Sequence, residues 1–239
     1  MLLQISEPNG PNENSRARKL GLGIDLGTTN SLVAIKMSDV AHVLTDKEGQ
    51  ALLPSVVNFG AEVTVGHAAL ELAVVDPENT IVSAKRLMGR SRDDLNKNQQ
   101  RGLIDADRLA FATRQGHKTP VEVSSEILNV LAVRARTLLE AEEDGVVLTV
   151  PAYFDDRQRQ ATRQAAELAG LNVLRLLNEP TAAVVPYGLD QHIKQPDVIT
   201  LYDLDACPFR ISILRLDRRL LRVLETGGES ALSGHLFDE

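Results

Sequence analysis

Cysteine is nearly absent from this sequence of 239 residues, and Cys207 is its single example. One thiol cannot form a disulfide within the chain, and by itself it cannot hold a metal ion or an iron–sulfur cluster. The sequence therefore has no disulfide framework and no cysteine-based metal site. A reducing compartment such as the cytoplasm fits this composition.

Excess positive charge and long apolar runs are also lacking. The 26 lysines and arginines are outnumbered by 33 acidic residues, and the net charge of −7 argues against a general nucleic-acid binder. The N-terminus has too short an apolar run for a signal peptide, and the sequence predicts no membrane span. Residues 1–18 are rich in Pro, Asn, Gly and Ser, which predicts a mobile leader.

The two most common nucleotide-binding loops are absent as well. No GxxxxGK[ST] pattern occurs, and GLGIDL at 21–26 lacks the last glycine of GxGxxG. A dinucleotide-binding dehydrogenase is therefore disfavoured.

Strand and helix patterns alternate along the chain, which predicts the α/β class. The predicted strands are 21–26, 32–35, 145–151, 171–177, Val198–Leu204, Ile211–Leu216 and Leu220–Leu224. One helix is expected to begin at Ser124 or Ser125 and a second at Asp155 or Asp156, with Gly170 ending the second. The expected apolar face of the first helix comprises Ile127, Leu128, Leu131, Ala135, Leu138 and Leu139. Pro180 suits the first turn of a further helix.

The turn Gly27-Thr28-Thr29-Asn30 joins the first two predicted strands. Backbone N–H groups near Gly27 and the two threonine hydroxyls suit phosphate oxygens. Asp25, at the end of the first strand, could hold Mg²⁺ through its water shell. A plain hairpin turn explains the same residues equally well, and the turn alone leaves both interpretations open.

Four longer motifs give this turn a context. They are GIDLGTTNS at 23–31, AKRLMGR at 84–90, VPAYFDDRQRQAT at 150–162 and LLNEPTAA at 176–183. Together they resemble the nucleotide-binding domain of DnaK-type chaperones, the heat-shock protein 70 family. The sequences of the leader and of the last two motifs are most similar to those of the family member that serves iron–sulfur cluster assembly.

The resemblance implies an actin-like ATPase (ribonuclease-H-like) fold in which two lobes close on ATP or ADP with Mg²⁺, and K⁺ is also possible. Residues 19–197 would form lobe I, with an inserted subdomain at about 56–123. Residues 198–239 would be a truncated start of lobe II, represented only by its first strands. The expected activity is that of a chaperone in the cytoplasm.

The resemblance also assigns individual roles. Lys85 would reach the γ-phosphate region and Glu179 would help to place the attacking water. Asp203, which opens the family's second phosphate loop, would serve catalysis and the metal, together with Asp25 on the metal side. From the residues alone, an exposed lysine beside Arg86 and a carboxylate at a helix start remain the alternatives.

Nucleotide contacts are expected from both lobes. Gly27, Thr28, Thr29 and Asn30 would bind phosphates from lobe I. Gly227 and Gly228, in the late motif GGESALSGHLFDE, would belong to a loop on the adenosine side.

The second phosphate loop departs from the family pattern Asp-Leu-Gly-Gly-Gly-Thr-Phe-Asp. Asp205 places a carboxylate where phosphate should bind, and Ala206 and Cys207 add Cβ atoms where the backbone must approach closely. Pro208 replaces a threonine and removes an N–H donor. These changes predict that ATP hydrolysis by this chain is impaired.

The expected partner proteins follow from the resemblance alone. Pro151, Arg159 and Arg175 match positions that relay the nucleotide state and meet a J-domain co-chaperone. An iron–sulfur scaffold protein would be bound only through a peptide-binding domain outside this sequence. No nucleic-acid or membrane partner is expected.

Two other functions stay open at this level. One is a non-catalytic remnant that binds nucleotide weakly or docks a J-domain protein. The other is a sugar kinase of the same superfold, although a sugar kinase has no reason to carry VPAYFDDRQRQAT.

Overall fold

The computed structural model describes most of the chain between its two ends. The described residues are 20–37, 40–95, 103–105, 109–141, 143–185, 197–203, 209–217 and 220–229. The predicted leader at 1–18 and the altered turn at 205–208 lie outside them.

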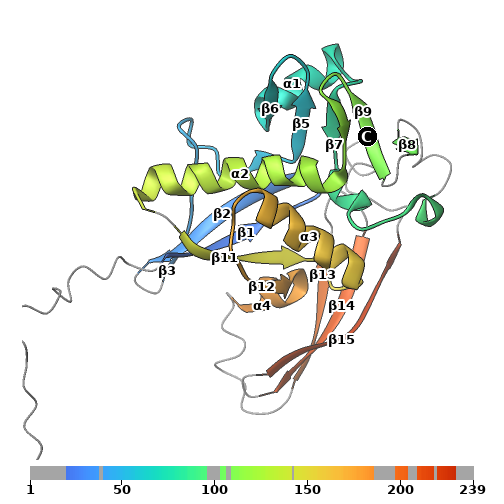
Figure 1. The fold of residues 1–239 in the computed structure, drawn as a ribbon. Helices are drawn as coiled ribbons and strands as arrows, with labels where there is room; N and C mark the ends of the chain where they lie inside the picture. Colours follow the sequence, from blue (N-terminus) through green and yellow to red (C-terminus); the bar gives the residue numbers. More distant parts are fainter. Residues whose placement is uncertain are drawn as a thin grey trace, which may run out of the picture.

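A mixed six-stranded sheet forms the centre of the structure (Figure 1). Its strands are β1 (Leu20–Asp25), β2 (Asn30–Met37), β3 (Val40–Val43), β4 (Leu53–Pro54), β11 (Glu143–Val150) and β12 (Val173–Asn178). The order is β12-β11-β1-β2-β3, and β4 pairs with β2. β1, β11 and β12 are parallel to one another, whereas β2 and β3 continue as an antiparallel meander. The four strands predicted in this part of the chain are confirmed, with small shifts at their ends.

Alternating apolar residues fix the face that each strand buries. Leu22 and Ile24 of β1 are almost fully buried, as are Val146 and Leu148 of β11. Leu22 pairs with Val146 and Ile24 with Leu148, so these side chains form rows across the sheet. A shift of one residue in either strand would turn the apolar side chains of that strand away from the core.

Two helices pack on this core. They are α2 (Pro120–Leu139) and α3 (Asp156–Leu168), and α2 runs along the sheet with α3 beside it (Figure 1). Capping boxes begin both helices, one between Thr119 and Glu122 and one between Asp155 and Gln158. The predicted start at Asp155 is therefore confirmed, and Gly170, with φ of 73°, follows the end of α3.

The predicted start of the other helix at Ser124 or Ser125 is wrong. Thr119 caps α2 and Pro120 occupies its first turn, where the missing proline N–H is not needed. Ser124 is instead buried inside the helix, and its hydroxyl contacts the sulfur of Met88. Leu138 was expected on the buried face but is 52% exposed, since the core-facing stripe continues from Ala135 to Leu139 and leaves Leu138 beside it.

The region between the first strands and α2 consists of small antiparallel sheets. Its strands are β5 (Val56–Phe59), β6 (Val63–Val65), β7 (Thr80–Val82), β8 (Leu103–Asp105), β9 (Leu109–Thr113) and β10 (Gly116–Lys118). They pair in the orders β6-β5-β7 and β10-β9-β8. The region also contains α1 (His67–Val75) and the 3₁₀ helices η2 (Ala84–Leu87) and η3 (Arg92–Asp94). Because these elements are short, the sequence of this region shows a less regular pattern of strands and helices.

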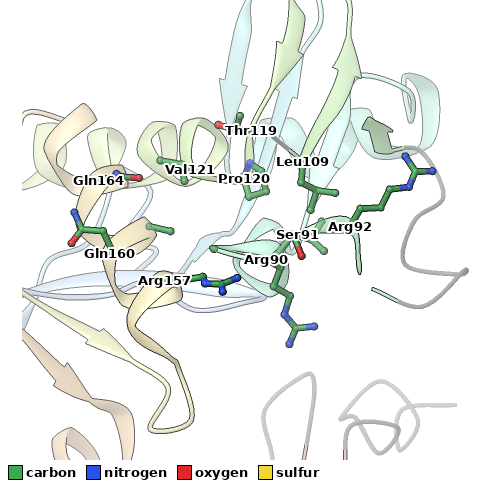
Figure 2. Close-up of a pocket in the computed structure, with 13 residues that line it drawn as sticks. Arg90, Ser91, Arg92, Leu109, Thr119, Pro120, Val121, Arg157, Gln160 and Gln164 are labelled. Carbon is green, nitrogen blue, oxygen red and sulfur yellow. The ribbon is translucent and has the colours of Figure 1, made fainter. Parts of the chain in front are cut away.

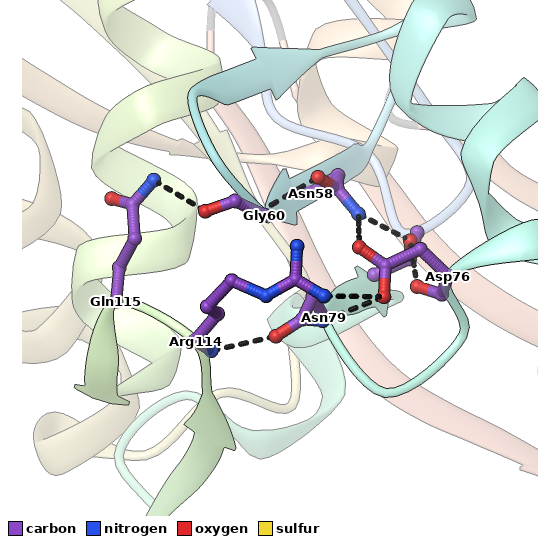
Figure 3. A network of polar contacts seen from close by, with 7 residues as sticks. Asn58, Gly60, Asp76, Asn79, Arg114 and Gln115 are labelled. Atoms are coloured by element: carbon purple, nitrogen blue, oxygen red, sulfur yellow. Dashed lines mark hydrogen bonds and ion pairs between the residues drawn. The ribbon is translucent and has the colours of Figure 1, made fainter.

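A polar network connects the two small sheets (Figure 3). The Asp76 carboxylate accepts hydrogen bonds from Asn58 Nδ2 at 3.2 Å and from Asn79 Nδ2 at 2.6 Å. The backbone N–H of Arg114, after β9, donates to Asn79 Oδ1, and Gln115 Nε2 donates to the carbonyl of Gly60. The β9–β10 hairpin is thus tied to the β5–β7 sheet through Asn79.

A separate antiparallel sheet contains the C-terminal strands, in the order β13-β14-β15. They are β13 (Asp197–Asp203), β14 (Phe209–Asp217) and β15 (Leu220–Glu229), which confirms the three strands predicted there. Its small core consists of Leu214 and Leu216 with Val184 of α4 (Glu179–Val184). The division into two lobes stays a prediction.

Replacing Asp76 by Asn should make the protein less stable at pH 7. Hydrogen bonds from Asn79 and Asn58, helped by the charge of Arg114, hold the pKa of Asp76 below its ordinary value of 3.8. The carboxylate therefore adds stability above pH 3.8, and this contribution is lost as the pH falls through the folded-state pKa. Urea unfolding at several pH values should show the gap between wild type and Asp76→Asn closing at acidic pH. A gap that stays constant with pH would contradict this, and exposed Glu78→Gln serves as the control.

Candidate functional site

The carboxyl ends of the three parallel strands meet at one edge of the central sheet. β1 ends at Asp25, β11 at Val150 and β12 at Asn178, and the register pairs Ile24 with Leu148 and Val150 with Asn178. The turn after β1 and Glu179 after β12 therefore emerge at this edge. In open α/β sheets this edge is where ligands bind.

The turn after β1 is tight enough to require glycine at one position. A Cβ atom on Gly27 would lie 1.9 Å from the carbonyl oxygen of Asn30. No side chain fits such a gap, so the sequence can close this turn only with glycine. The hydroxyl-bearing Thr28 and Thr29 are half-buried beside it, and within the described part of the chain no hydrogen bond engages their hydroxyls.

Two buried serines hold the turn from inside. Ser31 Oγ accepts a hydrogen bond from the N–H of Gly27 at 3.1 Å, and Ser55 Oγ donates to the carbonyl of Gly27 at 2.9 Å. The two hydroxyl oxygens lie 2.9 Å apart. Since the Ser55 proton is used on Gly27, Ser31 is the donor between them, and each hydroxyl donates once and accepts once. The N–H of Ser55 also donates to the carbonyl of Thr29 at 2.7 Å.

Asp25 is oriented by the neighbouring strand. The hydroxyl of Thr149, on β11, donates a hydrogen bond to Asp25 Oδ1. Carboxylate and hydroxyl oxygens are ligands that Mg²⁺ accepts, directly or through water. Asp25 with the Thr28–Thr29 turn therefore fits a magnesium–phosphate group. No cluster of three or more His, Cys, Asp or Glu side chains suited to a metal occurs among the residues that the structure describes.

A short ion pair crosses the same edge. Lys85 Nζ lies 2.6 Å from Glu179 Oε1, and the two side chains are 8% and 23% exposed. Lys85 comes from η2, and Glu179 is the first residue of α4. The interpretation of Lys85 as an exposed lysine is therefore excluded, whereas Glu179 does stand at a helix start. The pair unites two residues 94 positions apart that the resemblance assigns to phosphoryl chemistry.

The position of η2 depends on a close backbone contact. Gly89, with φ of 67°, follows η2, and a Cβ on it would lie 2.6 Å from backbone atoms of Gln158 in α3. Glycine there allows the segment after η2 to pack directly on the first turn of α3. The AKRLMGR motif thus supplies both the Lys85 ammonium and, at Gly89, the close backbone contact that helps to position it.

The three residues predicted to meet a partner differ in exposure. Pro151 is buried directly after β11, and Arg175 is exposed on β12. Arg159 of α3 is half-buried, and it donates to the carbonyl of Phe154 and, at 2.9 Å, to Asn178 Oδ1. Arg159 therefore braces the residue that precedes Glu179.

The remaining predicted residues lie on the C-terminal sheet. Asp203 ends β13, and its Cα partner is Arg210, which is also the partner of Gly228 on β15. The backbone register thus brings Asp203 and Gly228 to either side of one β14 residue. Gly227 and Gly228 belong to strand β15 rather than to a loop.

Comparison with known proteins identifies the family to which this chain belongs. A family model described as Hsp70 protein matches residues 21–239, so the chain belongs to the Hsp70 family of chaperones. The family implies an actin-like ATPase nucleotide-binding domain with nucleotide and Mg²⁺, and the α/β class agrees with it.

More particular relatives are chaperones named HscA. The chain is 53% identical over 248 residues to the Chaperone protein HscA homolog of Vibrio cholerae, covering 99% of this chain and 39% of the relative. It is 54% identical over 243 residues to the Chaperone protein HscA of Serratia proteamaculans. The homolog from Aeromonas hydrophila is 54% identical over 241 residues, again with 99% and 39% coverage. The chain thus spans about two fifths of the length of the curated relatives it matches.

Replacing Lys85 by Met should lower the free energy of unfolding by about 2–3 kcal/mol, because the Glu179 carboxylate would lose the ammonium that lies 2.6 Å from it. Because Glu179 is 23% exposed, the expected loss lies below the range of about 3–5 kcal/mol for fully buried pairs. Urea unfolding measures the loss, with exposed Arg86→Met as the matched control. Adding Glu179→Gln to Lys85→Met should restore part of the stability, and strictly additive losses would contradict the pairing.

Replacing Ser55 by Ala should lower the free energy of unfolding by about 1–3 kcal/mol, because the Gly27 carbonyl and the Ser31 hydroxyl would lose their partner. Ser31→Ala should cost a similar amount, and the double variant should cost less than the sum. Ser125→Ala, which removes a hydroxyl bonded within its own helix, is the control. Independent effects of Ser31 and Ser55 in urea unfolding would show that the hydroxyls do not act as one chain.

Proposed function

We propose that this chain is the ATP-binding part of an HscA-type chaperone, a protein that serves the maturation of iron–sulfur proteins in the cytoplasm. The proposal rests on one observation: the residues suited to phosphate and Mg²⁺ lie together at one edge of the central sheet. The Gly27 turn and Asp25 lie at the end of β1, and the Lys85–Glu179 pair lies at the end of β12. The names of the relatives supply the specific chaperone.

Each residue at this edge has a role with Mg²⁺–ATP. The amides of the turn and the hydroxyls of Thr28 and Thr29 would bind phosphate oxygens. Asp25, held by Thr149, would position the waters of Mg²⁺, which neutralises phosphate charge when bound. K⁺ as a further ion remains part of the proposal on family grounds.

Lys85 and Glu179 would divide the chemical step between them. The ammonium of Lys85 would offset negative charge that develops on the transferred phosphoryl group. Glu179, within hydrogen-bond distance of Lys85, would orient the attacking water as Lys85 turns toward the phosphates. Asp203, Gly227 and Gly228 would complete the site from the C-terminal sheet.

Hydrolysis by this chain is proposed to be impaired. The sequence at 205–208 offers a carboxylate and a proline where the family pattern offers glycine amides and a threonine. Loss of one preorganised donor costs about 10²–10³ in rate, and here several donors change together. The altered loop favours a second candidate function. In it, the chain binds nucleotide without useful turnover or only docks a J-domain partner. The sugar-kinase alternative has no support in the family match.

A J-domain co-chaperone of the HscB type is the proposed partner. Arg175 is the accessible member of the predicted set, since Pro151 is buried and Arg159 is bonded to Asn178. The iron–sulfur scaffold protein would interact only through a peptide-binding part beyond these residues. Within the part of the chain that the structure covers, no helix is both long and apolar enough to cross a bilayer.

ADP binding and single-turnover ATP cleavage test both parts of the proposal. The chain should bind ADP in a Mg²⁺-dependent way but cleave ATP at least 10²-fold more slowly than a variant with Asp205→Gly, Ala206→Gly, Cys207→Gly and Pro208→Thr. Adding Lys85→Met to that variant should abolish its gain. Absence of ADP binding would contradict the ATP-binding function, and equal cleavage with and without the loop changes would contradict the impairment.

A further inference from the structure

A pocket of about 650 Å³ lies where η2, β9, α2 and α3 meet (Figure 2). Its lining residues are Leu87, Gly89, Arg90, Ser91, Arg92, Leu109, Thr119, Pro120, Val121, Arg157, Gln160, Ala161 and Gln164. None of them belongs to the predicted nucleotide or partner residues. The volume falls within the range of small-molecule sites in proteins.

The pocket combines an apolar wall with a cationic rim. The wall consists of Leu87, Leu109, Pro120, Val121 and Ala161. The rim has three arginines, Arg90, Arg92 and Arg157, and Arg157 extends from α3 toward the segment that carries Arg90 (Figure 2). No carboxylate belongs to the described lining. Three arginines thus share one rim in a protein of net charge −7.

Asp94 is a carboxylate near the rim, and it is bonded to Ser91 of the lining. Its side chain accepts hydrogen bonds from the N–H and the hydroxyl of Ser91, at 2.8 and 2.7 Å. The same hydrogen bonds, with the charges of Arg157 and Arg90, hold the pKa of Asp94 below its ordinary value. Arg157 and Arg90 both act on this one exposed carboxylate, so at least two guanidinium groups lie near it.

The walls of the pocket are preformed. The contact between Gly89 and the backbone of Gln158 fixes the segment after η2 against α3. Met88, between Leu87 and Gly89, is fully buried, and the capping box of Thr119 fixes the start of α2. A ligand would therefore meet groups that are already in place, which lowers the entropic cost of binding.

We propose that this pocket binds a small organic anion that has an apolar part, such as an aromatic phosphate ester. The apolar part would contact Leu109, Pro120 and Ala161. The anionic group would accept charge-assisted hydrogen bonds from Arg157 and Arg90.

The pocket is linked to the Lys85–Glu179 pair through both of its walls. Leu87 and Lys85 lie on the same 3₁₀ helix. Arg157 and Arg159 lie on the same turn of α3, and Arg159 bonds Asn178, which precedes Glu179. A bound anion therefore acts on the two elements that position the ion pair. Any effect on ATP binding rests on the proposed function, whereas binding in the pocket does not.

Titration of the ¹⁵N-labelled chain with 1-naphthyl phosphate, without nucleotide, tests the proposal. Saturable amide shifts are expected at 87–92, 109 and 157–164, with smaller shifts at Lys85 and Glu179. Arg157→Gln should weaken binding about tenfold, because one charge-assisted hydrogen bond is lost. Arg157 is exposed, so this variant should keep the wild-type melting temperature.

Two controls decide whether the pocket is responsible. Arg215→Gln removes the same charge from exposed Arg215 on β14 and should leave the affinity unchanged. Neutral 1-naphthol should bind at least tenfold more weakly than its phosphate ester. The proposal is overturned by shifts that do not saturate, by shifts confined to the turn at 27–30, or by equal weakening in Arg157→Gln and Arg215→Gln. Absence of shifts at Lys85 and Glu179 would overturn the link to the ion pair.

Discussion

The parallel pairing of β1, β11 and β12 is the constraint on which the rest of the structure depends. Parallel strands cannot be joined by tight turns, so the chain must cross over between them. α3 lies in the connection from β11 to β12, and α2 lies in the longer connection from β1 to β11. Both helices cover the apolar rows of the sheet, and all three strands present their last residues at one edge. The candidate site exists because of this alignment.

Much of this architecture could be predicted from the sequence. Alternating apolar residues identified the strands, and Asp155 and Gly170 identified the ends of α3, because these signals are local. The start of α2 was placed wrongly because two serines in the helix imitate a cap, whereas Thr119, Pro120 and Glu122 form the real one. A Thr-Pro pair with Glu three positions after the threonine was the signal that could have found it.

The supporting residues of the site could not be predicted in the same way. Ser31 and Ser55 bond one another across 24 positions, and Thr149 reaches Asp25 across 124. Nothing local in the sequence relates these residues, because the contacts arise only when the strands pair. Lys85 and Glu179 were identified only by resemblance, since each has an ordinary local explanation. Their contact also depends on the segment after η2, which packs against α3 at Gly89.

The Lys85–Glu179 pair also determines how a phosphate group would enter this site. Lys85 and Glu179 are each other's counterion, so the site does not hold an isolated ammonium or an isolated carboxylate. A phosphate that takes Lys85 must compete with Glu179, and binding becomes an exchange of counterions. The affinity for phosphate would then reflect the difference between two ion pairs. If the proposed site binds phosphate, a polyphosphate of higher charge density would displace Glu179 more readily than a weak anion would.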